Sequence, residues 1–158
     1  MIKIIFVCLG NICRSPLGEA ICRHKIKALG LEDKIKCDSA GTANYHVGDP
    51  PDPRSVQSAI DHGIPIDHNG QQFTKRLSTQ FDYLIAMDQS NYRNMVTELG
   101  EEPDSLYLMR HFDLQNPDAD VPDPYYGGSD GFENVYQILD RSVDELLKFV
   151  IERHKLNG

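Results

Sequence analysis

Residues 4–16 read Ile-Ile-Phe-Val-Cys-Leu-Gly-Asn-Ile-Cys-Arg-Ser-Pro, and this stretch decides the fold class. Residues 4–7 are a continuous apolar run rich in β-branched side chains, which is typical of a strand buried on both faces of a sheet. Ser15 is a good helix N-cap and Pro16 suits the first helical position, so a helix is predicted to follow and to run to about Leu29. A strand, a glycine-containing loop and a helix in succession indicate an α/β unit.

The rest of the chain continues to alternate between strands and helices. Three further strands are predicted, over residues 35–39, 81–87 and 106–109. The alternation predicts a parallel sheet with helices on both faces. Ligands of such folds bind at the carboxyl ends of the strands, which is where residues 8–15 lie. Three further helices are predicted. One is capped by Asp52, ends at Gly63 and has Ile60 facing inward; one is capped by Asp88 and ends at Gly100; and one has an apolar period from Val135 to Ile151. In the helix that follows Ser15-Pro16, His24 and Ala28 are expected on the apolar face.

Length and composition describe an ordinary globular chain. Its 158 residues suit one domain, and 40% of them are hydrophobic and 25% charged. The net charge of −8 disfavours nucleic acid or an anionic membrane as a partner. No apolar run approaches the roughly 20 residues that span a membrane, and the apolar start lacks the cleavage pattern of a signal peptide. We therefore expect a cytoplasmic protein.

The cysteine pattern argues against disulfides and metals. The four cysteines, Cys8, Cys13, Cys22 and Cys37, all lie in the first quarter of the chain. Such clustering without a secretory signal does not indicate a disulfide framework. Because no pair has Cys-x-x-Cys or His-x-x-x-His spacing, neither a metal site nor another cofactor is expected.

The loop after the first strand has the parts of a phosphate site. Its successive amides and the start of the helix can together bind an anion, and Gly10 permits backbone angles that a side chain would forbid. Arg14 offers a planar fork for two phosphate oxygens, and Cys8 lies in the field of the amides and Arg14, which favours the nucleophilic thiolate. The alternative is a Cys8 that ends a buried strand and an Arg14 in solvent. Placement between a buried strand and Ser15-Pro16 favours the phosphate site.

The sequence resembles the low-molecular-weight protein tyrosine phosphatases over nearly its whole length. Four motifs carry the resemblance: residues 7–16, Asp38-Ser-Ala-Gly-Thr42, Pro51-Asp-Pro-Arg54 and Asp123-Pro-Tyr-Tyr126. The resemblance implies one domain, residues 1–158, with a four-stranded parallel sheet in the flavodoxin-like order 2-1-3-4. It also implies hydrolysis of phosphotyrosine and aryl phosphates through a phosphocysteine, without a metal.

The resemblance assigns roles to individual residues. Cys8 would be the nucleophile, Arg14 would bind the phosphoryl group and Asp123 would be the general acid and base. Expulsion of a phenolate-like oxygen is easier when a proton arrives as the bond breaks, which is the chemical reason for the acid. The remaining assignments are phosphate binding by Leu9, Gly10, Asn11, Ile12, Cys13 and Ser15, with the Ser15 hydroxyl on the thiolate, loop support by Ser39 and His68, and pocket walls formed by Tyr45, Tyr125 and Tyr126.

Without the resemblance, several of these positions stay open. Asp118, Asp120 and Asp123 are equally eligible acids, because all three lie in one polar loop. His68 alone would be a loop histidine at the surface. Tyr125 could merely pack the loop, as could the tyrosine that follows it.

Three other functions compete with tyrosine phosphate hydrolysis. Arsenate reduction on this fold needs further cysteines well beyond residue 37, and the chain has none there. Arginine phosphatases of this fold typically have threonine where the chain has Ile12. A phosphate-binding module or phosphocysteine carrier would need no general acid. The expected partner is a phosphotyrosine-containing protein, a tyrosine kinase being one candidate, and a monomer is favoured.

Overall fold

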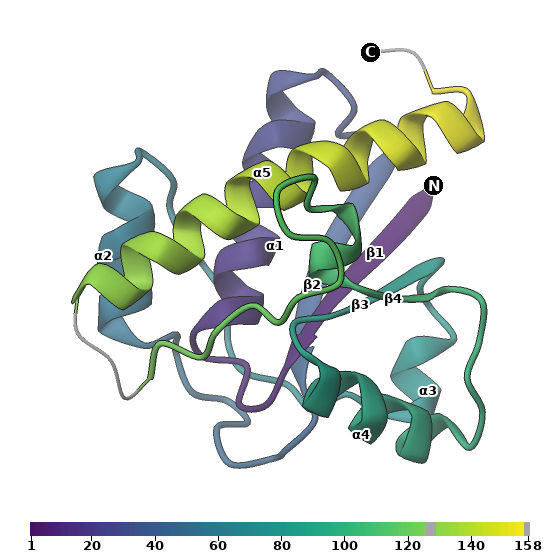
Figure 1. Ribbon diagram of the computed structural model, residues 1–158, viewed down its shortest axis with the longest axis horizontal. Coiled ribbons are helices and arrows are strands. Elements are labelled where there is room, and N and C mark those ends of the chain that lie inside the picture. The colour runs from purple at the N-terminus through teal and green to yellow at the C-terminus, as the bar shows by residue number, and fades with distance from the viewer. Residues whose placement is uncertain (126–128, 157–158) are drawn as a thin grey trace.

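The computed structural model describes residues 1–125 and 129–156. Four strands form its sheet, and the helices cover both faces (Figure 1). The elements, in chain order, are β1 (Ile2–Cys8), α1 (Arg14–Ala28), β2 (Ile35–Gly41), α2 (Pro53–Asp61), α3 (Lys75–Ser78), β3 (Tyr83–Ala86), α4 (Gln89–Leu99), β4 (Leu106–Leu108), the 3-10 helix η1 (Met109–Phe112) and α5 (Ser129–His154).

The sheet has the strand order β2-β1-β3-β4, and all of its paired strands are parallel. This confirms the predicted order 2-1-3-4. The fold places β1 in the interior of the sheet, which explains why residues 4–7 are apolar without interruption: every one of them is buried. The carboxyl end of β1 therefore opens between two neighbouring strands, where a loop can receive a ligand.

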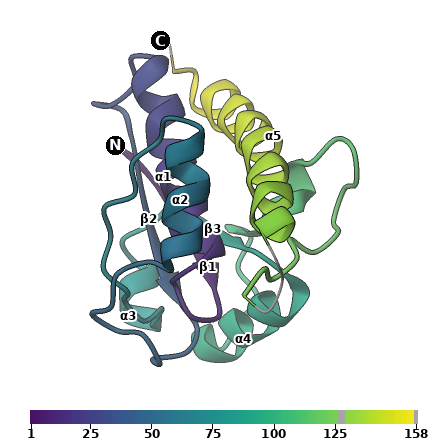
Figure 2. The same ribbon diagram turned by 90° about the vertical axis from the view of Figure 1, so that its left-hand side faces the viewer.

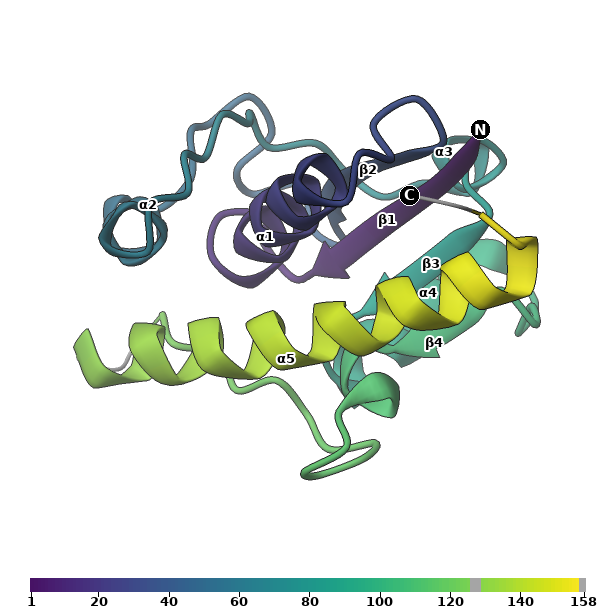
Figure 3. The ribbon, with the colours of Figure 1, turned by 90° about the horizontal axis from the view of Figure 1, so that it is seen from above.

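Successive residues of β1 pack into two separate cores. Ile4 and Phe6 face a core formed with α1, α2 and α5, whereas Ile5 and Val7 face a second core to which α4 is the main helix contributing. Figure 2 shows α1, α2 and α5 alongside one another, and Figure 3 shows the long α5 running past α1. Because successive side chains of a strand point to opposite faces of the sheet, β1 contributes to the core on each face.

The start of α1 differs from the prediction. The helix begins at Arg14, and Cys13 occupies the cap position without a side-chain hydrogen bond. Ser15 therefore lies inside the first turn, and its hydroxyl is turned toward the loop, 2.9 Å from the Cys8 Sγ. The other two predicted caps are confirmed, because Asp52 and Asp88 accept from backbone N–H groups at the starts of α2 and α4.

Some predicted boundaries and faces are also wrong. In α1, His24 and Ala28 are exposed, because the buried stripe continues through Cys22 and Ile26 instead. In α2, Ile60 is exposed, and the buried residues are Ser55, Ser58 and Ala59. Strand β2 continues two residues beyond the predicted Ser39, and β3 is shorter than predicted; α3 and η1 were not expected. Among the described residues, no helix combines the length and the apolar character needed to cross a membrane.

Candidate active site

The loop between β1 and α1 curls around the Cys8 side chain. Cys8 is buried, and its Sγ accepts from the backbone N–H of Asn11 at 3.3 Å. The Ser15 hydroxyl lies 2.9 Å from the same sulfur. Hydrogen bonds of this kind stabilise a negatively charged sulfur more than a neutral one. The geometry therefore suits a nucleophilic thiolate at the carboxyl end of β1.

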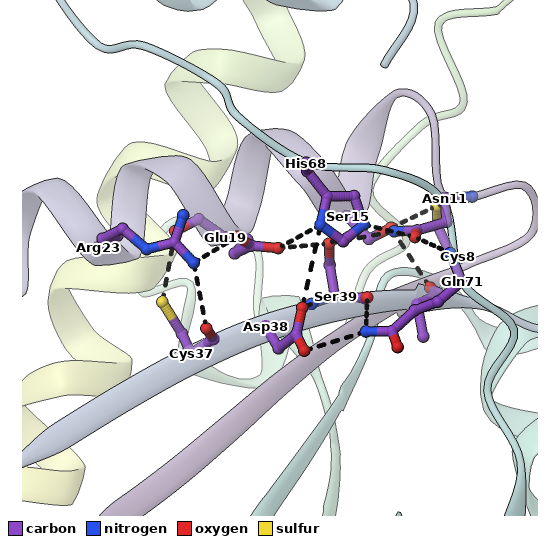
Figure 4. A network of polar contacts seen from close by, with 11 residues as sticks. Cys8, Asn11, Ser15, Glu19, Arg23, Cys37, Asp38, Ser39, His68 and Gln71 are labelled. Carbon is purple, nitrogen blue, oxygen red and sulfur yellow. Dashed lines mark hydrogen bonds and ion pairs between the residues drawn. The ribbon is translucent and has the colours of Figure 1, made fainter. Parts of the chain in front are cut away.

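Asn11 holds the loop in shape. Its φ of 57° lies in the left-handed region, which asparagine tolerates better than most residues. Its side-chain amide donates to Ser15 Oγ at 2.8 Å and to Ser39 Oγ at 3.1 Å. Its oxygen accepts from His68 Nε2 at 2.7 Å and from the Gln71 N–H at 3.0 Å (Figure 4). The structure thus brings together the residues expected to support the loop, and Gln71 in addition.

This network continues to a buried carboxylate that the sequence analysis missed. Glu19 is 2% exposed; it accepts from Ser39 Oγ at 2.7 Å and lies 3.2 Å from His68 Nδ1. Arg23 pairs with it at 2.6 Å from the following turn of α1 (Figure 4). A buried carboxylate needs such partners. The sequence signal that could have revealed Glu19 is its i, i+4 pairing with Arg23, because the residues between them in the helix, 20–22, are apolar.

His68 is therefore part of the loop support and not a surface residue. Its side chain is 8% exposed, and both ring nitrogens have partners. Glu19, Asp38 and His68 are also close enough to form a possible three-ligand metal group, with ligand atoms within 4.8 Å of one another. Both nitrogens of His68 already contact Asn11 and Glu19, so these groups are engaged in bracing the loop.

Arg14 is held by groups from two distant segments. Its side chain is 3% exposed, and its Nη1 donates to Asp88 Oδ2 at 2.7 Å and to the Val121 carbonyl at 2.9 Å. Burial alone would lower the pKa of Arg14, but the nearby Cys8 and Asp88 outweigh it and hold that pKa above its ordinary value. Asp88 thus has two functions, because it caps α4 and positions Arg14; the sequence analysis found only the cap.

The structure separates the three candidate acids. Asp123 Oδ2 lies 3.6 Å from Arg14 Nη2, and the Asp123 carboxylate is partly exposed. Asp118 instead contacts His111 at 3.0 Å, and Asp120 accepts from the Gln89 N–H at 2.9 Å. Neither of these two lines the cavity above Cys8, whereas Asp123 does. The geometry therefore selects the residue that the Asp-Pro-Tyr-Tyr motif indicated.

A cavity of about 210 Å³ opens above the loop. Tyr45 and Tyr125 form part of its wall, 72% and 39% exposed, so an aromatic ring could pack between them. Tyr126, the third predicted wall residue, lies outside the described residues. Asn11 and Ser15, which were predicted to bind phosphate, belong to the hydrogen-bond network behind the loop and do not line the cavity. The lining residues are Cys8, Leu9, Gly10, Ile12, Cys13, Arg14, Tyr45, His46, Asp123 and Tyr125.

Gly41, at the end of β2, permits the close approach of the loop. A Cβ at this position would lie 2.8 Å from the Leu9 carbonyl oxygen and 3.1 Å from the Asn11 nitrogen. A side chain there would displace the backbone of the loop. Gly41 is therefore a structural requirement of the site, although the sequence showed it only as the residue that ends a strand.

A thiol, a guanidinium and a carboxylate thus face one cavity at the carboxyl end of the central strand β1. A buried arginine and the amides of a loop that enters a helix suit a tetrahedral oxyanion such as phosphate. A thiol beneath them suits covalent catalysis. Fold and site together define a phosphate-binding α/β protein equipped with a nucleophile.

Comparison with known proteins identifies the family. The family model described as low molecular weight phosphotyrosine protein phosphatase matches residues 3–156. The chain therefore belongs to this family, and it is a low-molecular-weight protein tyrosine phosphatase by fold and sequence.

Individual relatives are similar over almost their whole length. The low molecular weight protein-tyrosine-phosphatase of Streptomyces coelicolor is 38% identical over 155 residues, which cover 96% of this chain and 94% of that protein. The human low molecular weight phosphotyrosine protein phosphatase is 39% identical over 138 residues, covering 85% of this chain and 87% of that protein. The crystal structure of a protein tyrosine phosphatase from Entamoeba histolytica has a TM-score of 0.90 at 36% identity, covering 99% of this chain and all of that one.

Proposed function

We propose that the protein hydrolyses phosphotyrosine and aryl phosphates through a phosphocysteine at Cys8, with Asp123 as general acid and base. The observation that carries this proposal is the arrangement of Cys8, Arg14 and Asp123 around one cavity. Membership of the phosphatase family supports the reaction class. The assignment of the individual steps rests on the geometry.

In the first step, the Cys8 sulfur attacks phosphorus, and the bond from phosphorus to the phenolic oxygen breaks. Arg14 and the loop amides hold the non-bridging oxygens, whose charge they stabilise in the transition state. Asp123 donates its proton to the leaving oxygen, so that a neutral phenol departs. Arg14 needs no reorganisation for this step, because Asp88 and the Val121 carbonyl already hold its guanidinium.

In the second step, water attacks phosphorus and the bond from sulfur to phosphorus breaks. Asp123, now a carboxylate, accepts a proton from the water, and inorganic phosphate leaves. The sulfur departs as a thiolate that the Asn11 N–H and the Ser15 hydroxyl stabilise. The cycle needs no metal, because Arg14 and the amides supply the positive charge that a metal would otherwise provide.

The walls of the cavity favour an aromatic ester. Tyr45 and Tyr125 lie at its mouth, whereas Cys8 lies buried at the base of the loop. A phosphotyrosine ring is long enough to touch the walls while its phosphate reaches the sulfur, and a phosphoserine is too short for both. Ile12, also in the lining, adds apolar surface that suits a phenyl ring better than a guanidinium.

We propose a phosphotyrosine-containing protein as the substrate, with a tyrosine kinase as one candidate, and a cytoplasmic monomer as the active form. Retention of Cys8, Arg14 and Asp123 together favours hydrolysis over phosphate transfer, since a carrier needs no acid. Arsenate reduction is not supported, because the chain has no cysteine after Cys37.

The test compares two substrates that differ in leaving group. Asp123→Asn should slow hydrolysis of phosphotyrosine by about 100- to 10,000-fold, and that of p-nitrophenyl phosphate much less, because p-nitrophenolate leaves without a proton. Asp118→Asn, in the same loop but on His111, is the matched control and should leave both rates unchanged. Equal losses on the two substrates would exclude Asp123 as the acid. Loss of wild-type turnover in EDTA would exclude a metal-independent reaction.

A further inference from the structure

A second cavity adjoins the candidate active site. It has a volume of about 430 Å³, against about 210 Å³ for the cavity above Cys8. Leu9 and Tyr45 line both cavities, so the two cavities meet at these residues. The chemistry proposed for Cys8 makes no use of the second cavity. A substrate larger than phosphotyrosine itself would nevertheless extend across it.

The second cavity has a fixed position relative to the phosphate loop. Thr42, in its lining, donates its backbone N–H to the Cys8 carbonyl at 2.9 Å, and the Ala43 N–H donates to the Leu9 carbonyl at 3.0 Å. The segment that follows β2 is therefore bonded directly to the first residues of the loop. Because of these bonds, a group bound in the second cavity lies at a defined place relative to the reacting sulfur.

The opposite wall comes from α4 and is acidic. Its lining residues are Asn94, Thr97 and Glu98, and Glu98 is the one charged side chain among the described residues that line this cavity. Glu98 is exposed, and its Oε2 accepts from the Lys75 N–H at 3.1 Å, which restrains the carboxylate. The ring of Tyr45, largely exposed, offers a face on which a cation can rest. A carboxylate, hydrogen-bonding groups and an aromatic face together suit a positively charged side chain.

We propose that the second cavity is a substrate subsite that binds a lysine or arginine side chain close to the phosphotyrosine in sequence. The proposal rests on the proposed function, because the phosphotyrosine must first occupy the cavity above Cys8. Adjacent residues of an extended peptide are about 3.3–3.6 Å apart, and the two cavities share Leu9 and Tyr45, so the experiment below tests the three positions on either side of the phosphotyrosine. The subsite thus selects basic sequences around phosphotyrosine, which also suits the net charge of −8.

The experiment measures kcat/KM on phosphotyrosine peptides of one length. Lysine, glutamate or alanine is placed in turn at each of the three positions on either side of the phosphotyrosine. We expect lysine to exceed alanine by about two- to fivefold at one or more positions, as for a partly exposed charge pair, and glutamate to fall below alanine. The preference should weaken at high salt, because exposed charges are screened.

Two variants separate a local contact from the overall charge. Glu98→Gln keeps an oxygen for the Lys75 N–H and should abolish the preference for lysine while p-nitrophenyl phosphate turnover stays at the wild-type rate. Glu101→Gln changes the net charge equally, from an exposed residue outside the cavity lining, and should retain the preference. A preference that persists in Glu98→Gln, or no preference in an active wild-type enzyme, would overturn the subsite. A wild-type protein that fails to turn over p-nitrophenyl phosphate would instead overturn the proposed function.

Discussion

Replacement of Asn11 by alanine tests whether the phosphate loop is held by the side chain behind it. Asn11 is 1% exposed and makes four side-chain hydrogen bonds, to Ser15, Ser39, His68 and Gln71. At about 0.5–1.5 kcal/mol for each, their loss should lower the free energy of unfolding by about 2–6 kcal/mol. Total stabilities of about 5–15 kcal/mol are usual, so the variant should still fold where the loss is about 2 kcal/mol, and unfolding before urea is added would mean a loss of about 6 kcal/mol.

The backbone of Asn11 adds a second, separable effect. Its φ of 57° costs an alanine about 1–2 kcal/mol but costs a glycine nothing. The greater freedom of glycine in the unfolded chain offsets about 0.4–1 kcal/mol of this advantage. Asn11→Gly should therefore be at least as stable as Asn11→Ala, which reverses the usual order of these two residues.

The assay is urea unfolding followed by circular dichroism, together with kcat/KM on p-nitrophenyl phosphate. The Asn11 side chain holds in place the backbone N–H that donates to the Cys8 sulfur. Because its loss should displace that N–H, we expect kcat/KM to fall at least about tenfold in both variants, which corresponds to about 1.4 kcal/mol. Asn44→Ala, at an exposed position, is the control and should stay within about 0.5 kcal/mol of wild type. A loss of less than about 1 kcal/mol in Asn11→Ala, or an Asn11→Gly variant less stable than Asn11→Ala, would refute this account of the loop.

Cys8→Ser should abolish turnover but retain phosphate binding by isothermal titration calorimetry, because Arg14 and the loop amides provide the oxyanion contacts; more than a few per cent of wild-type kcat would contradict covalent catalysis. Asp88→Asn should keep the cap of α4, since asparagine caps as well as aspartate, but should weaken the charge-assisted bond to Arg14 and lower kcat/KM about tenfold. Asp88→Ala should in addition lower Tm. A wild-type kcat/KM in Asp88→Asn would argue against the role of Asp88 in positioning Arg14. Peroxide should inactivate the enzyme reversibly through a Cys8–Cys13 disulfide, since both side chains line one cavity. Burial and the nearby Asp52 raise the pKa of Cys13, so Cys8 should be the sulfur that is oxidised first. Recovery by dithiothreitol that is equal in wild type and Cys13→Ser would show that Cys13 only packs the loop.

Much of the fold follows from local signals in the sequence. The apolar run of β1, the caps at Asp52 and Asp88 and the period of α5 each depend on residues within a few positions of one another, and the structure confirms them. The start of α1 was mispredicted because Ser15 has the right side chain for a cap but uses it on Cys8. The functional use of a side chain there overrides its local propensity.

The contiguous part of the site was likewise readable from the sequence. Residues 8–15 are contiguous and lead from the last residue of β1 into the first turn of α1, so their shared position at the end of β1 follows from the order of the elements alone. The choice of Asp123 over Asp118 and Asp120 as the acid rested on resemblance and stays a prediction. Of these three residues, Asp123 is the one that lines the cavity and lies near Arg14.

Contacts between segments that are distant in the sequence were decided only by the tertiary structure. Asp88 holds Arg14 from 74 residues away, and Gln71 reaches Asn11 across 60 residues. Glu19 was not singled out in the sequence, and only the tertiary structure shows it buried against Ser39 and His68. A local sequence pattern can specify a strand, a cap or a loop because those depend on neighbours along the chain. It cannot specify which buried polar groups meet, because that depends on how the sheet and the helices pack.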